Sequence, residues 1–171
     1  AGGNPGFGRD MGEADEGAEI GPVSRGDTVG ACALDASGSC AGAVSTGGIW
    51  LKLPGRVGDV PLPGAGLWVA PDGSGVAVAT GTGESLLRTL ICREAVDFMD
   101  SRSAQRACEL AIELLTRETG AGQGGIIGVD RDGFGWGLAT RGMGRAVWRE
   151  GMDEPAVAVW PDEAWDRAVS A

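Results

Sequence analysis

The chain has 171 residues, of which 43% are apolar, and this is enough for one domain with a hydrophobic core. Its formal net charge of −10 at pH 7 argues against a surface that follows nucleic-acid phosphates. The sequence contains no histidine, which excludes imidazole as acid, base or metal ligand and removes the usual Ser-His and Cys-His nucleophile pairs. Any catalysis must therefore use another group as its base.

The first 27 residues differ in composition from the rest of the chain. They hold eight glycines, six acidic residues, two arginines and few large apolar side chains. Such a segment cannot bury enough apolar surface to offset its chain entropy. We expect residues 1–27 to be a flexible linker or tail and residues 28–171 to form the folded domain.

The folded domain opens with β-type sequence. Residues 28–35 and 40–46 are short β-type runs separated by the turn-forming residues 36–39, and together they predict a hairpin. The Gly- and Pro-rich stretch 47–66 predicts a long loop, and long loops inside compact domains usually serve function. Residues 75–79, GVAVA, predict a buried strand.

Two helices are predicted in the middle of the chain. Apolar residues recur at helical spacing over residues 84–99 and predict one helix there. A second helix is expected from Ser103 to Glu118, with Ser103 as its N-cap and Gly120 as its stop.

Strands return after the helices. Residues 124–130 and 133–140 predict two strands joined by a tight turn, and AVAVW at 156–160 is a candidate for one more. The order strands, helices, strands predicts an α+β fold in which helices pack on one face of a largely antiparallel sheet.

The four cysteines, Cys32, Cys40, Cys92 and Cys108, show no zinc-type spacing. We expect buried free thiols in a reducing compartment, which favours a cytoplasmic protein. No apolar run reaches membrane-spanning length. We therefore expect no membrane partner, no nucleic-acid partner and no metal held by this chain.

Thr28 stands where the Gly-rich head meets the first strand. If the chain is cut between Asp27 and Thr28, the threonine gains a free α-amine, a group whose ordinary pKa is about 8, beside its own hydroxyl. Nucleophile and base would then belong to one residue. The alternative is an ordinary threonine that opens a strand.

Five motifs in order carry a family resemblance: DTVGACALD, STGG, KLPGRVGD, GAG and TGTGE. From Thr28 to about Trp148 the chain closely resembles the β-subunit of plant-type asparaginases and isoaspartyl peptidases. These are N-terminal nucleophile hydrolases with an αββα sandwich fold, so the resemblance implies that this chain forms half of such a sandwich.

The resemblance implies catalytic roles for four residues. The family precursor cleaves itself before the threonine that becomes the nucleophile, here Thr28, and the threonine of STGG, here Thr46, supports it by hydrogen bonding. Thr80 and Gly81 match the family's oxyanion hole. A glycine lets a backbone N–H approach a developing oxyanion, and the Thr80 hydroxyl can add a second donor.

The resemblance also implies a substrate-binding pair, Arg56 and Asp59, in the family's GRVGD motif. A guanidinium can bind an α-carboxylate through two parallel hydrogen bonds, and a carboxylate can pair with an α-ammonium. Such a pair recognises the two charges of a free amino acid. Taken alone, Arg56 and Asp59 could equally form an ordinary surface ion pair.

The implied substrates are L-asparagine and β-aspartyl dipeptides, cleaved to release L-aspartate. Two other branches are alternatives: glycosylasparaginases, which tend to have Asn after the Thr of STGG, and threonine aspartases. Retention of Asp59 argues against a threonine aspartase because an internal aspartate has no free α-ammonium. GLWVA and LLRTLICRE resemble that branch to some extent.

In the resembled family an α-subunit precedes the linker, completes the sandwich and carries a sodium-binding loop. The resemblance therefore implies an α-subunit partner, an (αβ)₂ assembly and no cofactor in this chain. The competing hypothesis is an inactive fragment or pseudoenzyme without its α half. Trp50 and Trp68 are candidates for the cleft wall or, equally, for core or interface packing. Core or interface packing is favoured for Trp136, Trp148, Trp160 and Trp165.

Overall fold

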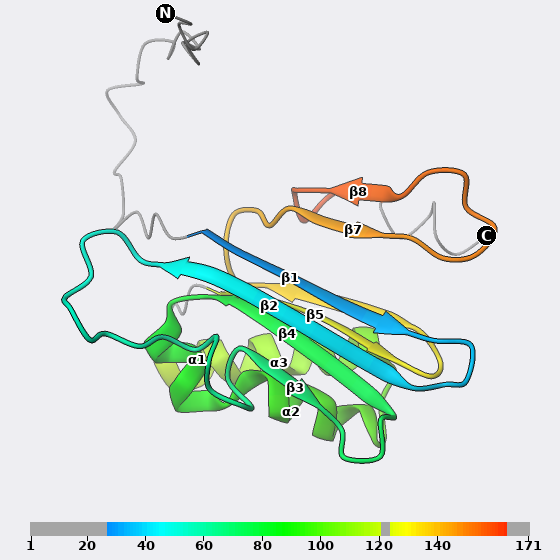
Figure 1. Cartoon of the computed structure of the whole chain (residues 1–171), viewed down its shortest axis with the longest axis horizontal. Coiled ribbons are helices and arrows are strands. Elements are labelled where there is room, and N and C mark those ends of the chain that lie inside the picture. Colours follow the sequence, from blue (N-terminus) through cyan, green and yellow to red (C-terminus); the bar gives the residue numbers. More distant parts are fainter. Residues whose placement is uncertain (1–26, 121–123, 164–171) are drawn as a thin grey trace, which may run out of the picture.

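The computed structural model describes residues 27–120 and 124–163 (Figure 1). The strands in these ranges are β1 (Asp27–Leu34), β2 (Cys40–Gly48), β3 (Leu67–Val69), β4 (Gly75–Gly81), β5 (Gly124–Asp130), β6 (Phe134–Leu138), β7 (Arg145–Val147) and β8 (Ala156–Ala158). The helices are α1 (Gly83–Thr89), α2 (Ile91–Met99) and α3 (Ala104–Thr119).

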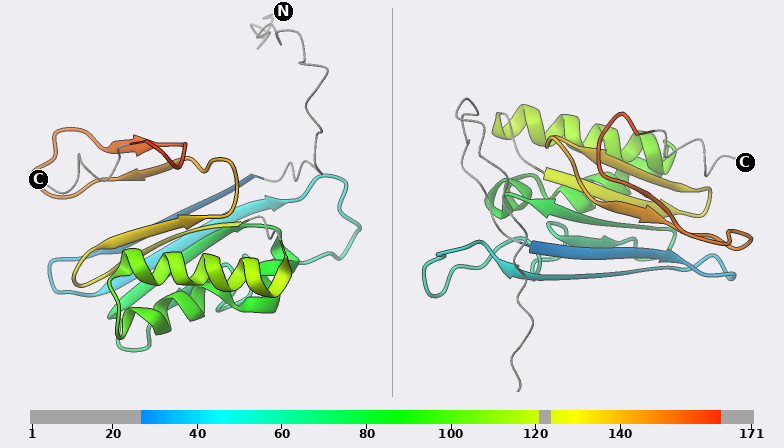
Figure 2. Two further views of the ribbon diagram at one scale, coloured as in Figure 1. Left: turned by 180° about the vertical axis from the view of Figure 1, so that it is seen from behind. Right: turned by 90° about the horizontal axis from the view of Figure 1, so that it is seen from above.

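A four-stranded sheet in the order β3-β4-β5-β6 lies at the centre of the fold, and its strand ladders are antiparallel. The three helices cover one face of this sheet, and the hairpin β1-β2 lies across the other face (Figures 1 and 2). The small sheet β7-β8 stands at the edge of the fold. The predicted antiparallel α+β arrangement with helices on one face is therefore confirmed, and the complete αββα sandwich stays a prediction.

The hydrophobic core lies between the sheet and the helices. Its largest side chains with no solvent exposure include Leu86, Ile91 and Leu115 from the three helices and Ile126 from β5. Cys92 and Cys108 are buried on the sheet-facing sides of their helices, as predicted, and the cysteines are free thiols. Burial of such aliphatic side chains is the main stabilising contribution on this side.

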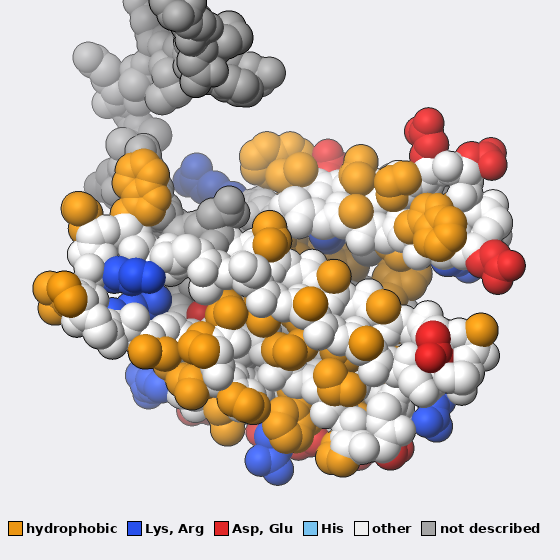
Figure 3. Space-filling model, in the orientation of Figure 1, with side chains coloured by type: hydrophobic (Ala, Val, Ile, Leu, Met, Phe, Trp, Pro, Cys, Tyr) orange, Lys and Arg blue, Asp and Glu red, His pale blue; other side chains and the backbone are white. Residues whose placement is uncertain are grey.

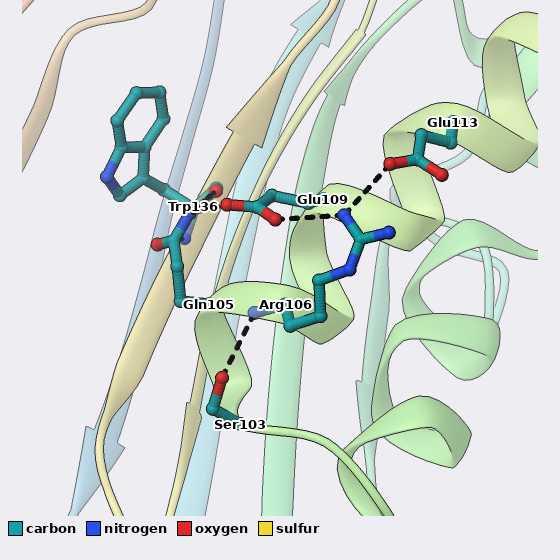
Figure 4. Close-up of polar contacts among 6 residues, drawn as sticks. All are labelled: Ser103, Gln105, Arg106, Glu109, Glu113 and Trp136. Carbon is teal, nitrogen blue, oxygen red and sulfur yellow. Dashed lines mark hydrogen bonds and ion pairs between the residues drawn. The ribbon is translucent and has the colours of Figure 1, made fainter.

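Helix α3 is fastened to the sheet at its first turn (Figure 4). The Ser103 Oγ accepts a hydrogen bond from the Arg106 N–H at 3.3 Å, which confirms the predicted N-cap. The Gln105 side-chain amide exchanges two hydrogen bonds of 3.0 and 3.1 Å with the backbone of Trp136 in β6. The helix ends at Thr119, before Gly120 with φ of 77°.

The prediction of one helix over residues 84–99 is wrong. Helix α1 ends at Thr89 and α2 begins at Ile91, because Leu90 adopts a left-handed conformation with φ 48° and ψ 45°. The break lets the Arg93 N–H donate to the Gly64 carbonyl oxygen at 3.0 Å, which ties the long loop to α2. Apolar spacing continues across the break, so periodicity alone did not reveal it.

The hairpin β1-β2 packs closely on the sheet through its glycines. A Cβ on Gly30 would lie 2.9 Å from a methyl of Val78, and one on Gly42 would lie 2.6 Å from a methyl of Leu67. Because side chains alternate along a strand, the other face points away from the sheet. Exposed on that face are Val29, Ala31, Ala33, Ala41 and Ala43 (Figure 3). We call these five residues the outer hairpin face.

The tryptophans differ in their surroundings. Trp68 packs against the core and lies under the Arg93 guanidinium, 5.9 Å from the ring centroid. Trp148 and Trp160 are 62% and 54% exposed, so of the two packing alternatives core packing is wrong for them and interface packing stays a prediction. Trp148 directly follows β7 and Trp160 lies two residues after β8, and these two short strands form a sheet of their own. Trp165 lies outside the described residues.

Candidate active site

One cavity of about 750 Å³ opens at the end of the sheet where β4 stops and β1 starts. It is lined by residues from the hairpin, the long loop, β4, β5 and the segment 140–146. The six residues predicted for catalysis and substrate binding all line it: Thr28, Thr46, Arg56, Asp59, Thr80 and Gly81. Motifs separated by up to 53 positions in the sequence therefore meet in one place.

Thr28 and Thr46 face each other across the hairpin. They are register partners of β1 and β2, and the Thr28 Oγ1 donates to the Thr46 Oγ1 at 3.0 Å. The Gly48 N–H donates to the same Thr46 oxygen at 3.0 Å. The ladder is irregular between Asp27 and Thr28, so the regular pairing starts at the threonine. These contacts hold the Thr28 hydroxyl at the mouth of the cavity.

Arg56 is held by Glu84 from the first turn of α1. Its Nε and Nη2 donate to the two Glu84 carboxylate oxygens at 2.9 and 3.0 Å. The hydrogen bonds from Arg56 hold the pKa of Glu84 below its usual value, and those same bonds raise the pKa of Arg56. Only 17% of the Arg56 side chain is exposed, so the guanidinium keeps one orientation.

Asp59 is a buried carboxylate, with 7% of the residue exposed. Its Oδ2 lies in the interior without a hydrogen-bond partner among the described residues. Burial raises the pKa of Asp59, and the nearby positive charge of Arg56 partly offsets this rise. A buried, unsatisfied anion beside a guanidinium is able to accept a cationic group such as an ammonium.

Thr80 and Gly81 are the last residues of β4 and pair with Gly125 and Gly124 of β5. Gly81 has φ of 143°, a conformation that residues with a Cβ rarely adopt. The chain turns there from the strand toward α1, which brings both residues to the cavity wall. Their proposed part in an oxyanion hole remains a prediction from the family resemblance.

Sequence reasoning missed several residues at this site. Glu84 belongs to the TGTGE motif, but its role depends on Arg56, which lies 28 positions earlier. Lys52 lines the cavity and its Nζ donates to the Gly47 carbonyl at 2.8 Å. The segment 140–146 forms another wall, and no pattern in its sequence indicated this.

The thiols do not compete as nucleophiles. Burial raises the pKa of Cys32 to about 12 and that of Cys92 well above its usual value, so neither forms a thiolate near neutral pH. Trp50 and Trp68 are not among the cavity-lining residues, so the cleft-wall alternative for them is wrong in the described structure. Paired hydroxyls, a guanidinium and a buried carboxylate therefore line the same cavity.

Comparison with known protein families identifies the class of protein to which this chain belongs. The family model described as asparaginase matches residues 8–157, a range that includes the whole cavity. The chain belongs to this family of hydrolases.

Named relatives include enzymes of both expected types. The chain is 49% identical over 127 residues to a plant-type L-asparaginase of Pyrobaculum calidifontis, covering 73% of this chain and 42% of the relative. It is 41% identical over 140 residues to an isoaspartyl peptidase of Escherichia coli, covering 80% of this chain and 42% of the relative. An N(4)-(β-N-acetylglucosaminyl)-L-asparaginase of Elizabethkingia miricola is 45% identical over 92 residues, covering 53% of this chain and 27% of the relative. The chain thus spans less than half the length of these relatives.

Proposed function

We propose that this chain is the β-subunit, with its linker attached, of an N-terminal threonine amidohydrolase. Its substrates are L-asparagine or β-aspartyl dipeptides, and its product is L-aspartate. The observation that carries this proposal is the convergence of six residues from separate motifs on one cavity, with the Thr28 hydroxyl 3.0 Å from that of Thr46. The asparaginase and isoaspartyl peptidase names of the relatives support the substrate class.

The proposed reaction begins with self-cleavage at Asp27–Thr28, which gives Thr28 a free α-amine. That amine takes the hydroxyl proton while the Thr28 oxygen bonds to the side-chain carbonyl carbon of the substrate. Thr80 and Gly81 donate hydrogen bonds to the resulting oxyanion. The C–N bond then breaks, ammonia or the amino group of the second residue leaves with the proton, and water hydrolyses the β-aspartyl ester.

Substrate recognition in this proposal uses the two opposite charges on the long loop. Arg56 binds the α-carboxylate of the substrate, and Asp59 binds the α-ammonium. The ammonium would give the buried Asp59 Oδ2 the partner that it lacks among the described residues. Because both charges belong to a free amino-acid end, the site favours β-aspartyl compounds over internal aspartates in proteins.

The proposal includes a second subunit. The relatives are more than twice as long as the stretch they share with this chain, and the outer hairpin face exposes five apolar residues (Figure 3). We propose that an α-subunit covers this face, extends the hairpin into a full sheet and supports an (αβ)₂ assembly. Any sodium site would then lie in the α-subunit, and this chain's own site needs no cofactor.

The glycosylasparaginase alternative rests on the Elizabethkingia relative, whose match is shorter than that of the other two. No relative named above is a threonine aspartase, and the presence of Asp59 in the cavity argues against that branch because an internal aspartate has no free α-ammonium. The inactive-fragment alternative makes a different prediction about Thr28, and the experiment below distinguishes it.

The experiment compares Thr28→Ala and Thr28→Ser with the unmodified full-length protein on L-asparagine and a β-aspartyl dipeptide. We expect Thr28→Ala to lose activity by at least about a thousandfold, and Thr28→Ser to retain part of it because a hydroxyl remains. Glycosylated asparagine and a peptide with an internal aspartate test the other branches. Equal activity of Thr28→Ala and the unmodified protein would contradict the proposal.

A further inference from the structure

Arg56 has two edges that can each bind a carboxylate through paired hydrogen bonds: Nε with Nη2, and Nη1 with Nη2. Glu84 occupies the first edge, at 2.9 and 3.0 Å. A substrate carboxylate can therefore approach Arg56 only through the second edge unless Glu84 leaves. The Glu84 contact therefore determines which edge of the Arg56 guanidinium is available to a substrate carboxylate.

Two glycines leave room for the same guanidinium on other sides. A Cβ on Gly58 would lie 2.7 Å from the Arg56 Nη1, and one on Gly83 would lie 2.9 Å from the Arg56 Nη2. The Gly83 Cβ would also lie 2.9 Å from the Asp59 Oδ1. Neither glycine has a positive φ, so the need for glycine here is steric and not conformational.

We propose that Glu84, together with Gly58 and Gly83, is a positioning device that fixes Arg56 so that its Nη1–Nη2 edge receives the substrate α-carboxylate. This inference rests on the proposed function, in which Arg56 binds that carboxylate. Glu84 touches Arg56 and not the reacting atoms, so it is a positioning residue. Gly83, one position before it, leaves the space in which Arg56 and Asp59 lie side by side, so that one amino-acid end can contact both side chains.

Removal of Glu84 has two opposing effects on binding. Arg56 becomes less neutralised, which strengthens its attraction for a carboxylate, but its long side chain also gains rotamer freedom that binding must then remove. The Glu84 side chain is 58% exposed, so solvent screens its charge. We therefore expect the loss of orientation to dominate and the affinity to fall.

The test measures L-aspartate binding to the full-length protein by titration calorimetry, with KM and kcat for a β-aspartyl dipeptide as second readouts. We expect Glu84→Gln to raise the Kd and the KM about five- to twentyfold, with kcat changed less than threefold. Gly83→Ala should raise the Kd at least as much, because its Cβ would lie 2.9 Å from both the Arg56 Nη2 and the Asp59 Oδ1 and would displace them. The matched control is Gly133→Ala, where a Cβ meets nothing within 4 Å and φ is not positive.

Glu84→Asp, with its carboxylate on a shorter stem, should restore part of the affinity that Glu84→Gln loses. An unchanged or lower Kd in Glu84→Gln, with normal binding by the unmodified protein, would overturn this inference and leave the proposed function standing. Absence of L-aspartate binding by the unmodified protein would overturn both. A Gly83→Ala variant that unfolds would leave Glu84→Gln and Glu84→Asp to decide.

Discussion

The two faces of the sheet β3-β4-β5-β6 differ in what covers them. On the helix face, aliphatic side chains such as Leu86 and Leu115 have no exposed surface and make a closed core. On the other face lies a hairpin whose contact with the sheet depends on glycines and whose outer hairpin face is exposed (Figures 1 and 3).

The polar site lies on the open side. There, one oxygen of the buried Asp59 carboxylate, Oδ2, lacks a hydrogen-bond partner among the described residues, and a fully exposed leucine, Leu51, adopts a left-handed conformation. Such features cost stability and are typical of functional regions. The contrast between the faces indicates that the helix side provides the stability and the hairpin side the function, and the following predictions test that division.

The largest effect is expected on the outer hairpin face. Ala43→Asp should change the stability of the isolated chain by less than about 0.5 kcal/mol, since residue 43 is exposed. It should weaken association with an α-subunit by about 3–5 kcal/mol, because an unpaired charge would be buried. Size-exclusion chromatography of the co-expressed subunits measures the association. Ala36→Asp in the exposed turn is the control. Normal assembly of Ala43→Asp would show that this face is not an interface.

A core truncation comes next. Leu115→Ala should lower the free energy of unfolding by about 2–5 kcal/mol, because the side chain has no exposed surface and a cavity would remain. Leu53→Ala on the long loop, where the leucine is 79% exposed, is the matched control and should change it by less than about 0.5 kcal/mol. Urea denaturation measures both, and equal effects would contradict the division between the two sides.

Asp59 links stability to function through pH. Burial raises its pKa in the folded state, so its charge costs stability above the ordinary value of 3.8, and this cost disappears as the pH falls through the raised pKa. Asp59→Asn should therefore stabilise the fold by on the order of 1 kcal/mol at pH 7 while it removes L-aspartate binding. The gain should vanish below pH 3.8. Thermal melts across this range would contradict the account if Asp59→Asn were destabilised at pH 7.

The smallest effect concerns the two leucines with positive φ. Leu51→Gly should stabilise the chain by about 0.5–1 kcal/mol, because Leu51 is fully exposed at φ 55° and loses no packing. Leu90→Gly should gain less, because Leu90 is 38% exposed and its methyl group packs over Gly64. Thermal melting of both variants compares them, and a larger gain at Leu90 would be the contrary result.

Most elements of the fold could be predicted because their signals are local. The Asp35–Ser39 turn of the hairpin, the Ser103 cap and the apolar stripe of α3 each depend on residues close in sequence. The break at Leu90 accompanies a hydrogen bond from Arg93 to Gly64, 29 positions earlier, and leucine is a poor indicator of left-handed backbone. The strand β7, Arg145–Val147, is too short to show a period.

The candidate site was likewise predictable only in part. Thr28, Thr46, Arg56, Asp59, Thr80 and Gly81 were found through motifs in family order, and composition alone would have selected none of them. Glu84 and the segment 140–146 were missed because their relation to the cavity exists only after folding. The hydrogen bonding of Arg56 shows why a motif can predict which residues form a site but not which edge of a side chain is available.

The measurement that tests the central claim most directly is the intact mass of the full-length protein after purification, followed at neutral pH. The account predicts two fragments, one of which begins at Thr28, and a single uncleaved species for Thr28→Ala. A protein that hydrolyses β-aspartyl dipeptides while its Asp27–Thr28 bond stays intact would contradict the claim that Thr28 works as an N-terminal nucleophile.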